Sequence, residues 1–329
     1  MADIDGPIPR DDGAPDGLSR RGMVSTLAFT GTGIPAALAA EPKVPAAAAA
    51  TERGEVLVNR AFARIREGLV HYRYAGDPKT GSALPLYMVH GGPGSSRGLD
   101  SSLRALGDKR LVIAPDTLGY GDSAAPDHAQ PEIEYYADSV IRIIDALGIE
   151  VIDFYGSHTG VHIGTEVALR YPTRVRRLIF DGITFFSPEE QKDYLANYAP
   201  AMQPDQYGRQ LTWAWHFVRD MALFFPHFNH SAEHRLNRGA PPPAQLHNSV
   251  LEVLKALTTY HLSYNAVFRH DLKSLLPKLK HPVLCVTSES DPNIRYLEAG
   301  AALIANAQKF IVKSGGDRGT ARMREFLDA

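Results

Sequence analysis

Residues 154–161 read FYGSHTGV, where an apolar strand-like run ends and two glycines enclose a short centre around His158. In a tight turn from a strand into a helix, the outer residues must be small because side chains there collide with neighbouring elements. The same turn holds its central side chain at the carboxyl end of the strand, beside the helix N-terminus. The stretch therefore predicts a reactive site with an imidazole at its centre.

Around this turn, from about residue 53, short apolar runs alternate with amphipathic helical stretches. Residues 133–148 are typical of a helix packed on a sheet, because apolar residues recur there every three or four positions. The alternation predicts an α/β fold with a mainly parallel sheet and helices on both faces. Eight strands are expected, at 58–65, 69–76, 85–91, 110–116, 152–158, 176–182, 282–288 and 309–315.

The alternation breaks between the sixth and seventh strands. Residues 184–270 read as helices and loops and are predicted to form a helical cap, which leaves 53–183 and 271–329 as the core. Trp213 and Phe217 share one helical face in this cap. Such a stripe packs against the sheet domain or lines an apolar pocket, since binding sites often lie between a sheet edge and the element that covers it.

Three motifs follow one another in a fixed order: HGGPGSS at 90–96, PDTLGYGDS at 115–123 and GSHTG at 156–160. In these motifs the chain from residue 53 resembles the α/β-hydrolase superfamily, in the capped branch that includes proline iminopeptidases, epoxide hydrolases and haloalkane dehalogenases. The resemblance implies the α/β-hydrolase fold, with the cap inserted between strands six and seven. It also implies an oxyanion hole formed by the backbone N–H groups of Gly92 and Thr159.

The chain departs from the superfamily pattern at two positions. His158 stands where the resemblance implies a nucleophile, and Asp317 stands near the place of the expected histidine after the eighth strand. The acid position after the seventh strand holds Asp291, and a second acid position after the sixth holds Asp181. Ser157 would replace the nucleophile only in an unusual register, because the residue before the apex points away from the cleft.

An imidazole at the apex is itself a base near neutral pH, so it needs only an aspartate to orient it. We expect His158 to be the catalytic residue, with Asp291 or Asp181 as its partner. The candidates for substrate contact are Ser157, Trp213, His216 and Phe217. No cofactor is expected. A metal site of His158, His162 and Glu166 is disfavoured because the outer two lie about 12 Å apart along a helix.

Three functions are compatible with this site. The first is a hydrolase for an ester, lactone or related carbonyl compound, with His158 as general base or nucleophile. The second is a cofactor-independent lyase or oxygenase in which His158 removes a proton from the substrate. The third is a binding protein without activity, because decay would remove both the serine and the histidine.

Composition limits the partners of the protein. The formal net charge of the 329 residues is −2 and the pI is near 6.7, so no basic footprint for nucleic acid is present. No segment after the N-terminal region is apolar and long enough to span a bilayer. The single cysteine, Cys285, lies in an apolar strand and is expected to be buried and inert. A small apolar or aromatic compound is the expected partner.

Residues 1–39 resemble a twin-arginine export signal. Arg20 and Arg21 precede a weakly apolar stretch, and small residues of the A-x-A kind follow it near Ala39. A disordered tail with a chance arginine pair is the alternative. With residues 40–52 as a linker, the signal predicts a periplasmic or secreted protein that is exported already folded.

A reporter fusion tests this prediction. Residues 1–45 fused to a reporter should reach the periplasm only when both Arg20 and Arg21 are present, because twin-arginine recognition depends on that pair. Reporter activity in the periplasmic fraction is the measurement, and a fusion with both arginines replaced by lysine is the control. Retention of the intact fusion in the cytoplasm would contradict the prediction.

Overall fold

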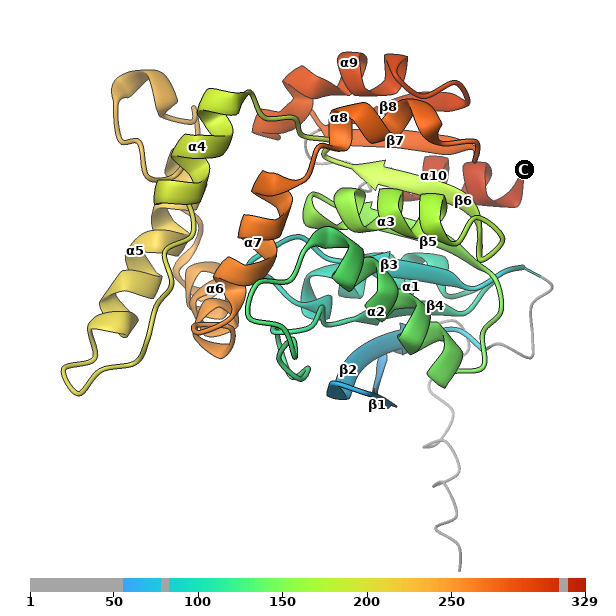
Figure 1. Ribbon diagram of the computed structural model, residues 1–329, viewed down its shortest axis with the longest axis horizontal. Coiled ribbons are helices and arrows are strands. Elements are labelled where there is room, and N and C mark those ends of the chain that lie inside the picture. The colour runs from blue at the N-terminus through green and yellow to red at the C-terminus, as the bar shows by residue number, and fades with distance from the viewer. Residues whose placement is uncertain (1–55, 78–82, 314–318) are drawn as a thin grey trace, which may run out of the picture. The chain divides into compact units, whose positions relative to one another are not determined.

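The sheet determines the architecture. The computed structural model describes residues 56–77, 83–313 and 319–329, so the expected signal, the linker and Asp317 lie outside the described residues. Eight strands form one sheet in the order β1-β2-β4-β3-β5-β6-β7-β8 (Figure 1). The strands are β1 (Asn59–Ile65), β2 (Gly68–Ala75), β3 (Leu86–Val89), β4 (Val112–Pro115), β5 (Ile152–Ser157), β6 (Val175–Asp181), β7 (Val283–Ser288) and β8 (Ala307–Val312).

The sheet is antiparallel at its β1–β2–β4 edge and parallel elsewhere. β1 pairs antiparallel with β2, and β2 pairs antiparallel with β4, whereas all pairs from β4 through β3 to β8 are parallel. Parallel strands bring their carboxyl ends to one edge of the sheet, where ligand sites of open α/β sheets form. The eight-stranded, mainly parallel sheet predicted from the sequence is confirmed.

Helices cover both faces because successive strand residues point to opposite sides. In β3, Tyr87 and Val89 join the apolar cluster under α2, α3 and α9, whereas Leu86 and Met88 join the cluster under α1 and α10. Both faces of the strand are therefore buried. The core helices are α1 (Asp100–Leu106), α2 (Ile133–Ala146), α3 (Thr159–Arg170), α8 (Leu272–Leu275), α9 (Leu297–Ala302) and α10 (Thr320–Asp328).

A helical segment lies between β6 and β7 in the chain, at the left of the sheet in Figure 1. Its helices are α4 (Pro188–Asn197), α5 (Arg209–Leu223), α6 (Pro243–Lys255) and α7 (Tyr260–Arg269), and we call it the cap. The 3₁₀ turns of the chain are η1 (Ser96–Leu99), η2 (Ala232–His234), η3 (Leu276–Lys278) and η4 (Pro292–Tyr296).

The cap is tied to the core through α7. The Tyr120 hydroxyl, in the turn after β4, donates to the carbonyl of Tyr260 at 2.8 Å and lies 2.6 Å from the hydroxyl of Ser263. Within the cap, the ring of Phe268 packs edge to face on those of Tyr194 and Tyr198, which are tilted by 31° to each other. These contacts hold the cap over the carboxyl edge of the sheet.

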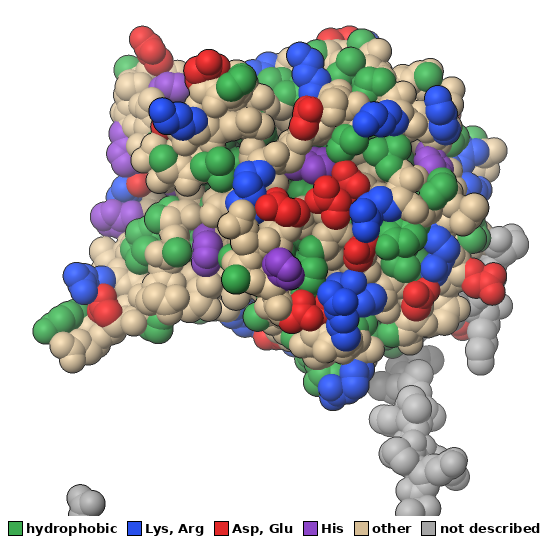
Figure 2. All heavy atoms as spheres, in the orientation of Figure 1, with side chains coloured by type: hydrophobic (Ala, Val, Ile, Leu, Met, Phe, Trp, Pro, Cys, Tyr) green, Lys and Arg blue, Asp and Glu red, His purple; other side chains and the backbone are tan. Residues whose placement is uncertain are grey.

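The surface and the single thiol agree with the composition. Figure 2 shows acidic and basic side chains interspersed on the face that it draws. In the part of the chain that the structure describes, no helix combines the length and the apolar character needed to cross a membrane. Cys285 is fully buried in β7, and burial raises the pKa of its thiol to about 12.

Close packing of α3 on the sheet leads to a stability prediction. A Cβ at Gly164 would lie 2.4 Å from Cε1 of Phe154 and 3.1 Å from Cε1 of Phe180. Gly164→Ala should therefore lower the free energy of unfolding by about 1–3 kcal/mol, as overpacked cores do. Urea unfolding provides the measurement. Gly98→Ala is the matched control because no atom lies within 4 Å of its added Cβ; equal losses in the two variants would contradict the packing argument.

Candidate active site

The turn at His158 has a strained backbone. His158 has φ 49° and ψ −101°, and it is the one non-glycine residue with positive φ among the described residues. A Cβ at Gly156 would lie 2.2 Å from the carbonyl oxygen of Gly160, so only glycine fits there. The backbone N–H of His158 donates to the carbonyl of Asp181 at 2.8 Å. The predicted elbow between β5 and α3 is therefore present in the structure.

Both ring nitrogens of His158 contact other side chains. Nε2 lies 3.1 Å from Oδ2 of Asp291, and the amide Nδ2 of Asn293 lies 3.1 Å from Nδ1. A neutral ring consistent with both contacts carries its proton on Nε2 and accepts the amide N–H at Nδ1. Of the two candidate aspartates, the structure places Asp291 against the imidazole. The other ring nitrogen contacts Asn293, a residue that the sequence reasoning missed.

Charge and burial oppose each other at this pair. Burial, the largest influence, lowers the pKa of His158, but the hydrogen bond and charge of Asp291 and the charge of Asp181 outweigh it, so the pKa is raised. Burial raises the pKa of Asp291, but His158, the backbone N–H of Asn293 and the charge of Arg238 together lower it below its ordinary value. The pair therefore favours an ionised carboxylate beside an imidazole that holds a proton readily.

Asp181 and Ser157 occupy other positions. Asp181 ends β6, where Oδ2 accepts a hydrogen bond from the Tyr155 hydroxyl at 2.7 Å. Ser157 pairs with Asp181 across β5 and β6 and is half-buried. Ser157 is the last residue of β5, directly before His158, and it lines neither cavity at His158. The structure thus brings Asp291, and not Ser157, to the imidazole.

A cavity of about 290 Å³ opens at His158. Gly92 and Thr159, the expected oxyanion residues, line it together with Asp291 and Asn293. The cap contributes an apolar wall and one cation. These cap residues are Tyr198, Met221, Phe224, Phe225, His227, Arg238 and Tyr264. The imidazole side chain is 41% exposed, which here means exposed to the cavity.

The predicted substrate contacts from the cap lie elsewhere. Trp213 stacks on Phe217 with ring centroids 5.0 Å apart, and both pack against Tyr260 inside the cap. His216 is exposed. These three residues line neither cavity at His158. Met221 lies one turn beyond Phe217 on α5 and lines the cavity. Phe224, which follows the last residue of α5 and has an extended backbone, lines it as well.

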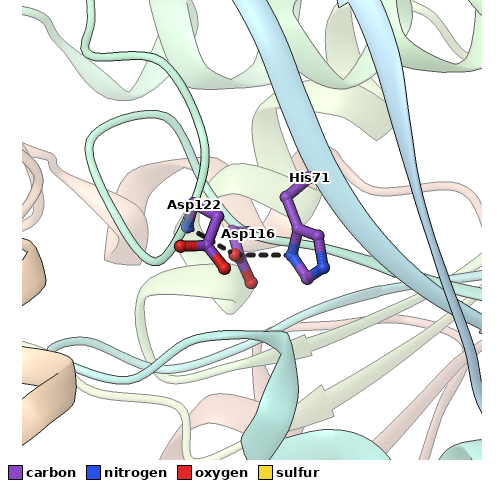
Figure 3. Close-up of side chains that lie close together, drawn as sticks. All are labelled: His71, Asp116 and Asp122. Carbon is purple, nitrogen blue, oxygen red and sulfur yellow. Dashed lines mark hydrogen bonds and ion pairs between the residues drawn. The ribbon is translucent and has the colours of Figure 1, made fainter.

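Asp116 supports the loop that carries Gly92. This buried carboxylate, after β4, accepts the backbone N–H of Ser96 at 2.8 Å and that of Asp122 at 2.9 Å, and it lies 2.8 Å from Nδ1 of His71. Figure 3 shows the side chains of His71, Asp116 and Asp122 close together. His90 adds a second link, since its Nε2 accepts the backbone N–H of Thr117. The two loops at the carboxyl edge are thereby held to each other.

His71, Asp116 and Asp122 also have ligand atoms close enough together for a metal ion, the one such group among the described residues. Their hydrogen bonds match a different role. Nε2 of His71 accepts from Arg60, and the carboxylate of Asp122 accepts from Arg60 and Lys255. Two protein cations therefore supply the positive charge that a metal would bring, and the group fits an ion-pair network better than a metal centre.

His162 and Glu166 make a separate chain of contacts. Nδ1 of His162 lies 3.0 Å from Nδ1 of His270, and Nε2 of His270 lies 3.0 Å from Oε1 of Glu166. Burial, with the charges of His270 and His158, lowers the pKa of His162 well below its ordinary value. His270 follows the last cap helix, so its place beside α3 depended on how the cap meets the core.

A larger cavity of about 620 Å³ lies at the opposite edge of the sheet. It is lined by residues that precede β3, β4 and β5, such as Pro85, Leu111 and Val151. Glu150 is its one carboxylate, and its walls hold no histidine. The smaller cavity at His158 is therefore the candidate active site.

Comparison with known proteins agrees with this fold. A family described as alpha/beta hydrolase fold matches residues 85–317. The chain is 41% identical over 106 residues to a 2-hydroxymuconate semialdehyde hydrolase of Pseudomonas sp. (strain CF600). The aligned segment makes up 31% of this chain and 38% of that protein. It is 32% identical over 127 residues to a 2-hydroxy-6-oxo-2,4-heptadienoate hydrolase of Pseudomonas putida, and this aligned segment makes up 37% of this chain and 46% of that protein.

These matches span less than half the length of either curated relative. The crystal structure of Epoxide Hydrolase A from Mycobacterium thermoresistibile is similar over 83% of this chain and 99% of that chain, with a TM-score of 0.65 and 19% identity. At that identity the likeness shows the fold alone.

The His158–Asp291 contact leads to a prediction about protonation. The imidazole of His158 should titrate above 6.5 in the wild-type protein, because the carboxylate stabilises its charged form. Asp291→Asn should move this midpoint to lower pH, because burial then acts without the compensating charge. The measurement is NMR titration of the ring resonance that disappears in His158→Asn.

Asp138→Asn is the matched control, since Asp138 pairs with Arg170 at the surface. This variant should leave the His158 midpoint unchanged. A midpoint that stays the same in Asp291→Asn would show that the carboxylate does not govern the imidazole.

Proposed function

The chain belongs to the alpha/beta hydrolase fold family, and on this basis we propose that it hydrolyses a small ester, lactone or related carbonyl compound in the cavity at His158. One observation supports the proposal most strongly: His158 sits at the apex of the strained elbow with Asp291 against Nε2. In this family fold the apex holds the group that attacks the substrate. A preserved elbow with a preserved acid partner favours catalysis over mere binding.

His158 acts through Nδ1 in this proposal. Because Nε2–H donates to the carboxylate, the lone pair of the neutral ring is on Nδ1. That nitrogen is covered only by the neutral amide of Asn293, and such a hydrogen bond has a net worth of about 1 kcal/mol. A substrate carbonyl can displace the amide at little cost, whereas the charge-assisted contact at Nε2 stays in place.

The position at the apex favours nucleophilic attack over general-base action on water. Nδ1 bonds to the carbonyl carbon, the C–O bond to the leaving group breaks, and the alkoxide leaves as the alcohol after it takes a proton from solvent. The acyl-imidazole that forms on His158 keeps its Nε2 proton toward Asp291. The backbone N–H groups of Gly92 and Thr159 face the same cavity and are the proposed donors to the oxyanion. Thr159 begins α3, so the helix dipole assists there. Water then releases the acid product from the imidazole.

The cavity walls suggest the substrate class. Phe224, Phe225 and Tyr264 suit an apolar or aromatic body, and Arg238 adds positive charge near Asp291. The Nε of Arg238 is held by the carbonyl of Ala222 at 2.7 Å, which fixes the guanidinium over the cavity. Two relatives have names that denote acidic oxo compounds as substrates. We therefore propose a carbonyl compound with an apolar body and an acidic group.

Ester hydrolysis tests the proposal. The wild-type protein should release p-nitrophenol from a short-chain p-nitrophenyl ester, and His158→Ala should lower the rate by about 10²–10⁴-fold. Ser157→Ala, the adjacent control, should retain most of the activity because Ser157 does not line the cavity. Rapid mixing with the ester should give an acyl adduct that peptide mass spectrometry maps to His158.

Other outcomes separate the alternatives. Hydrolysis that depends on His158 without any acyl adduct would favour the general-base mode on water. Fluorophosphonate labelling of Ser157 that is lost in Ser157→Ala would return the site to serine chemistry. Turnover of a carbonyl compound without incorporation of oxygen from ¹⁸O-water would favour a lyase or oxygenase, and binding without turnover would contradict the hydrolase proposal.

A further inference from the structure

A second histidine lies one helical turn beyond the apex. His162 is buried on α3 and lines a small cavity of about 60 Å³ that adjoins the larger one. His158, Thr159 and Asn293 line both cavities. The walls of the small cavity are otherwise aromatic and apolar, apart from Thr184. Its size suits one or two water molecules and excludes a larger ligand.

A hydrogen-bonded chain leads away from this cavity. Glu166 accepts from Nε2 of His270, and the two histidines meet at their Nδ1 atoms, 3.0 Å apart. One Nδ1 must donate and the other must accept. Since a neutral His270 uses its proton at Nε2, its Nδ1 accepts from Nδ1–H of His162. The second nitrogen of His162, Nε2, then carries a lone pair on the ring edge away from His270.

Asn293 supplies a second sign of a ligand in the small cavity. Its side-chain amide is 5% exposed, and Nδ2 lies against His158. Oδ1 is buried without a hydrogen-bond partner among the described residues. A buried acceptor without a partner costs about 1–3 kcal/mol, and water is the partner that a polar cavity of this size supplies.

We propose that the small cavity binds the hydrolytic water and that His162 is the base that activates it. This inference rests on the proposed function and supplies its second step. Water donates one hydrogen to Oδ1 of Asn293 and faces Nε2 of His162. Its other O–H bond breaks, the proton goes to Nε2, and the hydroxide oxygen bonds to the carbonyl carbon of the acyl-imidazole. The C–N bond to His158 then breaks and the acid leaves.

The hydrogen-bonded chain from His162 through His270 to Glu166 can accept the proton that water loses. When Nε2 of His162 gains a proton, Nδ1–H of His162 passes to Nδ1 of His270, so the positive charge comes to rest beside Glu166. The buried carboxyl group is 3.0 Å away and offsets that charge. His162 itself is kept uncharged, because burial and its histidine neighbours lower its pKa. It is therefore in the base form when water binds.

His158 cannot perform this second step itself. In the acyl-imidazole, Nδ1 carries the acyl group and Nε2 faces Asp291, so neither nitrogen is available to water. The second step needs a separate base close to the apex. Four residues along α3, His162 lies on the same side of the helix as His158. His270 and Glu166 act through His162 and are positioning residues.

His162→Asn tests the proposal in the full-length protein. The amide N–H of Asn can still donate to Nδ1 of His270, but the side chain has no basic nitrogen. With a p-nitrophenyl ester, the initial burst of p-nitrophenol should keep its amplitude while the steady-state rate falls by about 10²–10⁴-fold. Acyl-His158 should accumulate and be visible by mass spectrometry. Glu166→Gln should show the same pattern with a smaller loss.

His281→Asn is the matched control, because this histidine lines neither cavity at His158 and its Nε2 contacts the carbonyl of Pro172. It should leave both phases unchanged, and thermal unfolding should confirm that all variants fold. An equal loss of burst and steady-state rate in His162→Asn, or no loss in either, would overturn the proposal. Failure of the wild-type protein to hydrolyse any ester would instead overturn the proposed function.

Discussion

The backbone of His158 is the constraint on which the site depends. A non-glycine residue at φ 49° and ψ −101° carries strain of about 1–3 kcal/mol, which persists only because the surroundings allow no alternative. A Cβ at Gly182 would lie 2.7 Å from the imidazole, and one at Gly156 would meet the carbonyl of Gly160. Glycine backbone thus encloses the elbow and the ring. The imidazole is held in one position, which makes its contacts specific.

Strand ends and loops then supply the partners of this fixed ring. Parallel strands bring the residues after β3, β5 and β7 to one edge, so Gly92, His158 and Asp291 meet without long connections. The turn at η4 adds Asn293, because the Asp291 side chain caps that turn and accepts the N–H of Asn293 at 2.8 Å. A single turn therefore presents a carboxylate to one ring nitrogen and an amide to the other.

The sequence was sufficient for those parts of the site that the main chain dictates. The eight strands, the glycines of the elbow and the places of Gly92, Thr159 and Asp291 follow from patterns and motifs in the sequence. Asn293 was missed although it lies two residues after Asp291. The motif predicts the position of the acid, but it does not predict the turn that the Asp291 side chain caps. His270 was missed for a different reason. Its contact with His162 depends on how the cap returns to the core, and no local pattern encodes that.

The aromatic stripe of the cap shows the same limit. Helical periodicity correctly placed Trp213 and Phe217 on one face, but it did not show what that face packs against. In the structure Trp213 and Phe217 pack inside the cap, whereas Met221 near the end of α5 and Phe224 just after it reach the cavity. Hydrophobic periodicity predicts which side chains lie on the same face of a helix. What that face contacts depends on the tertiary structure.

His158, which precedes α3, and His162 in its first turn show how one residue type takes two roles. They are four residues apart, yet the pKa of His158 is raised and that of His162 is lowered. Burial acts in the same direction on both, so the difference comes from the partner: a carboxylate at His158 and a second imidazole at His162. Groups whose environments push their pKa values apart are suited to divide acid–base work. A site that lacks the serine and the histidine of the superfamily pattern therefore holds, at the start of one helix, two imidazoles with distinct proton affinities.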